Sequence, residues 1–174
     1  SSPPILSNLQ SLILRSDGHP HRTDILRLEK CLSLLTLPTL KSFARIQLED
    51  RVGADHFKVS LAHLHHLELD RCMLSSDSIL TLLEACEGLQ SLEIAFENPD
   101  TTEVEVDLGE DLLSSLYSRS ETLERLALLM PNGYGFEHSV ELPTPLDLHP
   151  LQSLRYLEID MYVLFAMRDL VHYS

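Results

Sequence analysis

Three neighbouring histidines are the side chains best suited to chemistry in this sequence. His63, His65 and His66 could bind a metal, because imidazole is a common ligand, or exchange protons near neutral pH. A metal site needs further ligands held in a fixed geometry, and none is recognisable nearby. We therefore expect no metal, and we interpret all three as solvated or strand-face histidines. His66, which should lie beside Glu68, could still respond to pH.

An acidic segment, residues 97–111, is the second candidate for chemistry. It holds seven acidic residues and no basic one, but it lacks the D-x-[DN]-x-[DN]-G pattern of a calcium loop. We interpret it as a solvated acidic loop. Residues 131–150, which include Asn132-Gly133 and several prolines, also have the composition of a loop.

Motifs of catalysis are missing from the sequence. There is no nucleophile elbow, phosphate-binding glycine loop or metalloprotease motif, and Asn132-Gly133-Tyr134-Gly135 is a turn signal. We predict that the chain is not an enzyme and uses no cofactor. The cysteines Cys31, Cys72 and Cys86 are widely spaced and odd in number, which favours a reducing compartment over a disulfide framework. We therefore expect an intracellular protein, cytoplasmic or nuclear.

One short phrase, Leu-x-x-Leu-x-Leu with Ile allowed at the end, recurs along the chain. The elements that it predicts must position the histidines and cysteines discussed above. The phrases begin at Leu9, Leu64, Leu89, Leu123 and Leu154, and a degenerate copy begins at Leu40. Two of the intervals between them, 24 and 25 residues, match the period of leucine-rich repeats, and the longer ones carry insertions. Within each phrase apolar and polar residues alternate, which predicts a half-buried strand.

Between phrases the apolar period changes to that of a helix. Three apolar stripes are found: Ile25, Leu28, Leu32 and Leu35; Ile79, Leu82, Leu83 and Cys86; and Leu112, Leu113, Leu116 and Tyr117. Thr23 or Asp24 could cap the first helix, and Ser75, Ser76 or Asp77 the second. Gly88 stands where a helix often stops.

The pattern predicts an α/β leucine-rich-repeat solenoid, a curved horseshoe with parallel strands on its concave face and helices on its convex face. Residues 1–174 would form one domain fragment of about six irregular repeats. The alternative is an ordinary α/β domain of βαβ units. Cys72 lies three residues after Leu69, where such repeats place an Asn or Cys that hydrogen-bonds the turn.

The net charge of −14, from 27 acidic and 13 basic side chains, disfavours nucleic acid and anionic membranes as partners and favours a basic protein surface. No apolar run is long enough to span a membrane. The start, Ser1-Ser2-Pro3-Pro4, has neither a Met nor the features of a signal peptide, so we expect a piece of a longer protein.

Residues at the third, fifth and seventh places of each phrase should share the concave face. The candidates for partner binding are His66, Glu68, Asp70, Ser91, Glu93, Arg125, Ala127, Tyr156, Glu158 and Asp160. Further members of this face are Ser11, Ile13, Arg15, Ala95 and Leu129. Tyr and Arg are favoured at interface hot spots, so Arg125 and Tyr156 are the expected anchors, with the carboxylates selecting a partner of opposite charge. The alternative is that the face is merely solvated.

One stretch carries a resemblance beyond the repeat pattern. Leu64-His65-His66-Leu67-Glu68-Leu69-Asp70-Arg71-Cys72, followed by Leu82-Leu83-Glu84-Ala85-Cys86-Glu87-Gly88-Leu89-Gln90-Ser91-Leu92, resembles the leucine-rich-repeat region of fungal F-box proteins. Thr122-Leu123-Glu124-Arg125-Leu126 and Leu151-Gln152-Ser153-Leu154 are similar to the phrasing of that family. The resemblance covers roughly residues 37–164.

The resemblance implies a function in ubiquitination. In that family an F-box docks the adaptor of a Skp–cullin–F-box ubiquitin ligase, and the repeats hold the substrate. No F-box is recognisable in this sequence, so the adaptor would be reached only through a domain outside it. The expected function is protein–protein interaction, with substrate recognition as the specific role. A repeat scaffold unrelated to ubiquitination is the alternative.

Overall fold

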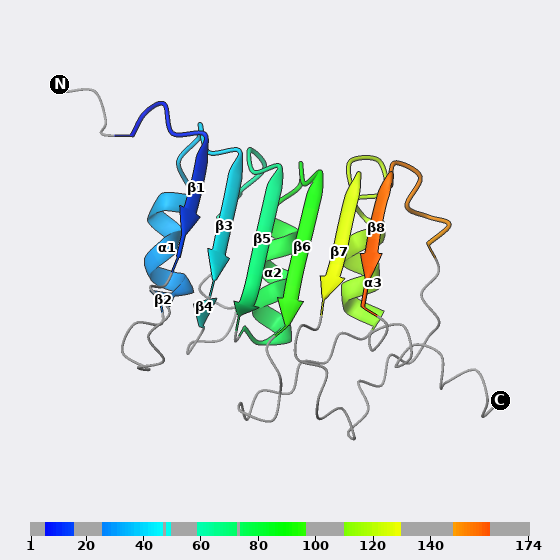
Figure 1. The fold of residues 1–174 in the computed structure, drawn as a ribbon. Helices are drawn as coiled ribbons and strands as arrows, with labels where there is room; N and C mark the ends of the chain where they lie inside the picture. The colour runs from blue at the N-terminus through cyan, green and yellow to red at the C-terminus, as the bar shows by residue number, and fades with distance from the viewer. Residues whose placement is uncertain are drawn as a thin grey trace, which may run out of the picture.

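Six parallel strands form one sheet in the order in which they occur along the chain. The computed structural model describes residues 6–15, 26–46, 48–49, 59–72, 74–96, 110–129 and 148–160. The strands are β1 (Ser11–Leu14), β3 (Ser42–Ile46), β5 (His66–Cys72), β6 (Ser91–Phe96), β7 (Arg125–Leu129) and β8 (Tyr156–Ile159), and Figure 1 shows them side by side. Each leucine phrase, including the degenerate one, thus ends in one strand of the sheet. The predicted α/β class with parallel strands is confirmed.

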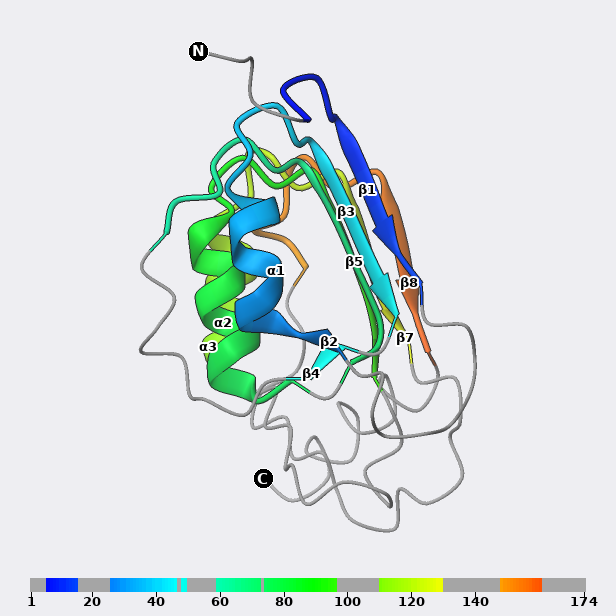
Figure 2. The same ribbon diagram turned by 90° about the vertical axis from the view of Figure 1, so that its left-hand side faces the viewer.

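Three helices cover one face of this sheet. They are α1 (Leu28–Leu35), α2 (Ser76–Ala85) and α3 (Glu110–Tyr117), and Figure 2 shows all three on the same side. A second, two-stranded parallel sheet pairs β2 (Leu26–Arg27) with β4 (Leu48–Glu49). The opposite side of the main sheet carries no described helix, and we call it the helix-free face.

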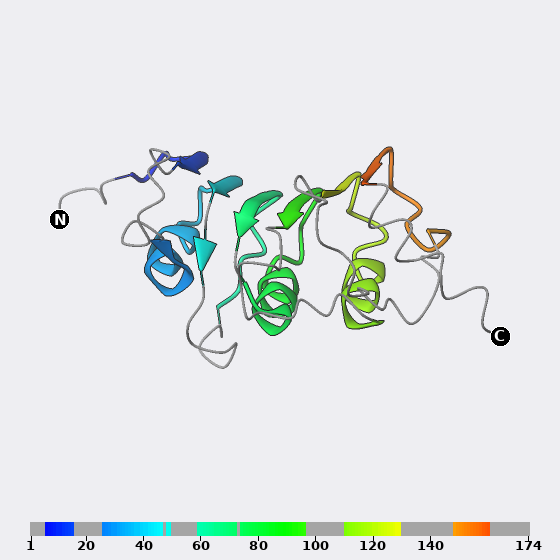
Figure 3. The same cartoon turned by 60° about the horizontal axis from the view of Figure 1, so that its bottom comes forward.

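The main sheet is curved, with its two outer strands displaced toward the helix-free side (Figures 2 and 3). In Figures 2 and 3 the outer strands β1 and β8 stand farther from the row of helices than the central strands do. Helices are wider than strands, so stacking both kinds of element in parallel rows curves the sheet away from the helices. The helix-free face is therefore concave.

The register between strands places equal phrase positions in the same row. The fourth-place residues Leu12, Phe43, Leu67, Leu92, Leu126 and Leu157 follow one another across the sheet. The sixth-place row runs through Leu14, Arg45, Leu69, Ile94, Leu128 and Ile159 in the same way. Both rows point toward the helices, and their central leucines and isoleucine belong to one core with the apolar faces of α1, α2 and α3.

A repeated backbone contact fixes this register. The carbonyl oxygen of the second phrase residue accepts hydrogen bonds from two consecutive N–H groups of the next phrase. Gln10, Lys41, His65, Gln90 and Glu124 all accept in this way, over N···O distances of 2.7–3.0 Å. The first of the two donor residues at one junction supplies the acceptor carbonyl at the next junction, as Lys41 does. The five junctions therefore have the same geometry.

The start of α2 agrees with the cap predicted from the sequence, whereas α1 starts later than predicted. Ser75 caps α2, because its side chain accepts a hydrogen bond from the Ser78 N–H at 3.3 Å. The first helix begins only at Leu28, after Arg27, which makes no side-chain cap hydrogen bond. The caps predicted for it, Thr23 and Asp24, lie outside the described residues, as does Ile25.

Two predictions about surface segments are also decided in part. Glu110 and Asp111, the end of the predicted acidic loop, belong to α3, so the loop prediction was wrong for them. The rest of residues 97–111, residue 97 to 109, lies outside the described residues, as do residues 131–147. Leu157 occupies a predicted core position but is 41 % exposed, because β8 is the last of the described strands and no described helix lies behind it.

Candidate functional site

The helix-free face gathers the predicted partner-binding residues into rows. The third-place residues of the phrases form the first row: Ser11, Ser42, His66, Ser91, Arg125 and Tyr156. The fifth-place residues form the second row: Ile13, Ala44, Glu68, Glu93, Ala127 and Glu158. Asp70, Ala95 and Leu129 belong to the third row. Asp160 follows β8 at the same level, since its N–H donates to the Leu128 carbonyl at 3.0 Å. The register therefore brings all ten predicted residues to one face.

Arg125 and Tyr156, adjacent in the first row, form a stacked pair near the β8 edge of this face. The guanidinium carbon of Arg125 lies 3.9 Å from the centroid of the Tyr156 ring. Its Nη2 lies 3.3 Å from Glu93 Oε2 and 3.8 Å from Glu158 Oε2. Tyr156 Oη donates a hydrogen bond to the same Glu158 oxygen at 2.8 Å. Three strands, β6, β7 and β8, thus hold one cation between two carboxylates and over one aromatic ring.

The charges around Arg125 keep it protonated. Desolvation by burial lowers its pKa, but hydrogen bonds and charge interactions with Glu93 and Tyr156 together outweigh it, and the net shift is upward. The ring of Tyr156 is nevertheless 44 % exposed, so the stacked pair is open to a partner. An exposed aromatic ring that is already oriented offers contact area at a low cost in conformational entropy.

Carboxylates outnumber cations on this face. Glu68 is exposed and stands beside Glu93 in the second, fifth-place row, and it has no ion-pair partner among the described residues. Asp70 pairs with its neighbour Arg71 at 3.5 Å, where the backbone turns through a positive φ of 48°. Like charges side by side on adjacent strands destabilise a sheet unless a cation lies between them. The face is therefore suited to a positively charged ligand.

Small residues form the floor between these charges. Ala127 lies between Glu93 and Glu158 in its row, and its side chain is fully buried. It shapes the surface but presents no area to a partner. Ala44 and Ala95 are buried on the same face. The contribution of Ser42 and Ala44 was missed at the sequence level because their phrase is degenerate, although the constant spacing from Leu40 would have located them.

The histidines do not gather into a metal site. His63 lies in the turn before β5, not on the strand as expected, and its Nε2 is 2.9 Å from the Leu35 carbonyl oxygen of α1. Burial, followed by the charges of Lys41, His66 and His63, lowers the pKa of His65. Within the described part of the chain, no three His, Cys, Asp or Glu side chains are grouped so that they could hold a metal ion.

Cys72 has the structural contact that its position predicts. Its Sγ accepts a hydrogen bond from the Leu48 N–H at 3.4 Å and lies 3.5 Å from the Asp70 carbonyl oxygen. The strand register shifts between Asp70 and Cys72, so the thiol turns in toward the neighbouring chain segment. The predicted structural hydrogen bonding of Cys72 is confirmed, although the N–H donor belongs to β4 and not to a turn.

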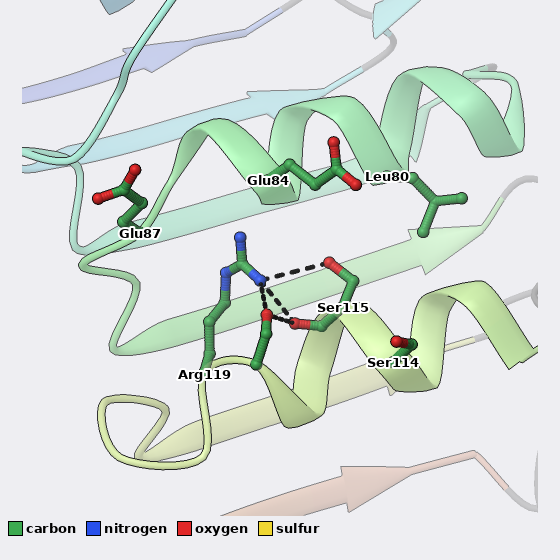
Figure 4. A pocket seen from close by; sticks show the side chains of 7 residues that line it. Leu80, Glu84, Glu87, Ser114, Ser115 and Arg119 are labelled. Carbon is green, nitrogen blue, oxygen red and sulfur yellow. Dashed lines mark hydrogen bonds between the residues drawn. The ribbon is translucent and has the colours of Figure 1, made fainter.

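A cleft lies on the helical side, between α2 and α3. This cleft has a volume of about 680 Å³ and is lined by Leu80, Glu84, Glu87, Ser114, Ser115, Ser118 and Arg119. Figure 4 shows Arg119 at its base, reaching from the end of α3 toward α2. Arg119 could not be predicted from the sequence, because nothing in the apolar pattern marks an arginine that follows a helix.

Arg119 binds the carbonyl ends of both helices. Its Nη2 donates to the Leu83 carbonyl, its Nε to the Cys86 carbonyl at 3.3 Å, and its Nη1 to the Ser115 carbonyl at 2.6 Å. Burial lowers its pKa, and Cys86, Glu84 and Glu87 oppose that shift. Helix carbonyl ends lack partners within the helix and carry partial negative charge. Arg119 is therefore a structural cation that joins α2 to α3, with its donors directed at protein acceptors.

Comparison with known proteins adds no identification. No protein-family model, no curated protein and no solved structure matches this chain. None of the described helices combines the length and the apolar character needed to cross a bilayer. The residues and their geometry are thus the basis for assigning a function.

Proposed function

We propose that this chain is a leucine-rich-repeat module that binds a protein partner on its concave, helix-free face and performs no catalysis. The observation that carries the proposal is the Arg125–Tyr156 stack between Glu93 and Glu158, displayed on an open sheet surface. Oriented Arg and Tyr side chains are frequent centres of binding energy in protein interfaces. The side chains displayed on such an open sheet would position the bound protein.

The repeat architecture is supported by the sameness of successive units. Six phrases give six strands, five junctions share one backbone contact, and the fourth-place residues keep one register from β1 to β8. In a solenoid each unit buries its apolar side only against its neighbours, which produces this kind of regularity. In an ordinary α/β domain, whose strand connections are unrelated to one another, the same two-donor contact is not expected at five successive junctions.

The partner surface that fits best is basic. Five carboxylates, Glu68, Asp70, Glu93, Glu158 and Asp160, share the described part of the face with two arginines, Arg15 and Arg125, and the whole chain has a net charge of −14. Nucleic acids and anionic membranes would be repelled by this charge. Charge complementarity would raise the association rate and select for lysine- or arginine-rich segments.

We further propose, on the resemblance to the repeats of fungal F-box proteins, that the partner is a substrate of a Skp–cullin–F-box ubiquitin ligase. The chain would then act inside the cell. The second candidate is a repeat scaffold unrelated to ubiquitination. Co-purification of the adaptor and the cullin with the full-length protein separates the two, because a scaffold would recover neither.

Binding by the face itself can be tested with a defined probe, a fluorescein-labelled peptide of alternating Arg and Ser. The triple variant Glu68→Gln/Glu93→Gln/Glu158→Gln should weaken binding at least about tenfold, which corresponds to roughly 1.4 kcal/mol. The matched control, Glu84→Gln/Glu87→Gln/Glu121→Gln, removes the same charge from exposed positions away from that face and should change the affinity little. Equal losses in both triples would mean that net charge alone attracts the peptide.

A further inference from the structure

The two outer strands of the main sheet carry complementary backbone edges. At each internal junction, a second-place carbonyl accepts two N–H groups, as the Glu124 carbonyl does from Arg155 and Tyr156. The N–H groups of Gln10 and Ser11 hold the equivalent donor place at the open edge of β1, and they meet no acceptor among the described residues. The Arg155 carbonyl holds the acceptor place at the open edge of β8, where no described donor reaches it.

The apolar rows also stop short at both edges. Leu12 on β1 is only half-buried, whereas Phe43 and Leu67 in the same row are fully buried. At the other edge Leu157, again in this row, is 41 % exposed. Extending the register across a junction between β8 and β1 would place Leu157 beside Leu12. The row of buried leucines would then continue through the contact.

The charges at the two edges are opposite. The register continued one place beyond Leu14 puts Arg15 at the level of Ile46, in the row that runs through Asp70, Ala95 and Leu129 to Asp160. Arg15 and Asp160 would therefore be neighbours across the same junction. Opposite charges at facing positions of adjacent strands stabilise their pairing.

We propose that β8 of one copy of this chain pairs in parallel with β1 of a second copy, head to tail, and so continues the sheet across the two molecules. The contact repeats the geometry of the five internal junctions: one carbonyl with two donors, one apolar row and one charge pair. Because the two surfaces differ, the association is heterologous and forms an open chain or a ring, not a closed dimer. The proposal goes beyond partner binding by the helix-free face and does not depend on it.

The test is sedimentation velocity of the full chain from about 1 to 100 µM, at about 0.15 M ionic strength so that the net charge of each copy is screened over about 8 Å. The wild type should form dimers and larger species as concentration rises. Leu12→Lys blocks one edge and Leu157→Lys blocks the other, so each variant alone should stay monomeric. An equal mixture of the two keeps one intact edge of each kind, and it should form a dimer and nothing larger.

Controls separate edge pairing from nonspecific association. Ser114→Lys adds the same charge at an exposed position of α3 and should associate as the wild type does. Circular dichroism establishes that each variant is folded. If a lysine variant is not, the charge swap serves instead: Arg15→Asp and Asp160→Arg should each weaken association, and the double variant should restore it. A wild type that stays monomeric throughout, or a mixture of the edge variants that does not dimerise, overturns the proposal, whatever the outcome of peptide binding.

Discussion

Gly88 lies against the backbone of Ala62, so closely that a Cβ atom on Gly88 would stand 2.6 Å from the Ala62 carbonyl oxygen. The two residues belong to the turns that precede β6 and β5, and the contact sets how closely these two units approach. A carbonyl oxygen cannot move aside as a flexible side chain can. Gly88 is thus required here by close packing between repeats, in addition to its position after α2.

Gly88→Ala should destabilise the chain by about 1 to 3 kcal/mol, the usual range for overpacking. The measurement is urea-induced unfolding followed by circular dichroism. Glu87→Ala, at the exposed neighbouring position, is the control and should change the free energy of unfolding by less than about 0.5 kcal/mol. Equal stability of Gly88→Ala and wild type would show that the turns can separate without cost.

Arg119→Met should cost about 3 kcal/mol of stability, because it leaves the Leu83, Cys86 and Ser115 carbonyls without a charged donor in a site where Arg119 is only 6 % exposed. Thermal and urea unfolding measure the loss. Arg155→Met is the matched control, since the Arg155 side chain is 81 % exposed and meets Glu124 only at 3.9 Å. Exposed ion pairs contribute little, so its effect should stay below about 0.5 kcal/mol. Similar losses in both variants would contradict a joining role for Arg119.

Cys86 should make stability depend on pH in the alkaline range. Burial raises the pKa of its thiol from 9.0 to about 12, although the charge of Arg119 opposes the shift. The folded state therefore holds this proton more tightly than the unfolded state. Its contribution to stability is complete below pH 9 and is lost as the pH rises from 9 toward 12.

The comparison of wild type with Cys86→Ala isolates this dependence, because other groups titrate alike in both. Above pH 9 the wild type should lose up to about 1 kcal/mol per pH unit more than the variant does in urea unfolding. Below pH 9 the difference between the two should be constant. Parallel stability curves up to pH 11 would mean that the thiol ionises normally in the fold.

The leucine phrases allowed the strands and the inward-facing rows to be predicted, because alternation and spacing are local properties of the sequence. Ser75 as a cap and Cys72 in its turn were predictable for the same reason. The burial of Arg45 was not predictable. This charged residue occupies a core row and is only 4 % exposed, and an apolar pattern does not predict a buried arginine. Contacts between units determine the positions of Arg119 and His63 and the approach of Gly88 to Ala62. The residue spacing within one unit does not predict such contacts.

The inward row can be tested with one substitution made at two depths. Leu67→Asp places a charge at a position that is 2 % exposed, in the centre of the sheet, and should cost at least about 4 kcal/mol or prevent folding. Leu157→Asp makes the same change in the same row at the exposed edge, and it should cost less than about 1 kcal/mol. Circular dichroism melts compare the two. Equal melting temperatures would show that the row is not the core.

The pairing of Arg125 with Tyr156 can be measured by a double-mutant cycle of Arg125→Ala and Tyr156→Ala. Both residues are accessible and the stack lies on the surface, so each single variant should lose less than about 1 kcal/mol, with a coupling of about 0.5 kcal/mol. Binding should respond more strongly than stability. Tyr156→Ala should weaken the affinity for the Arg–Ser peptide severalfold, because the exposed ring would contact the peptide. Unfolding of Tyr156→Ala would mean instead that the ring supports the sheet, and the partner-binding residues would then have to be sought away from β8.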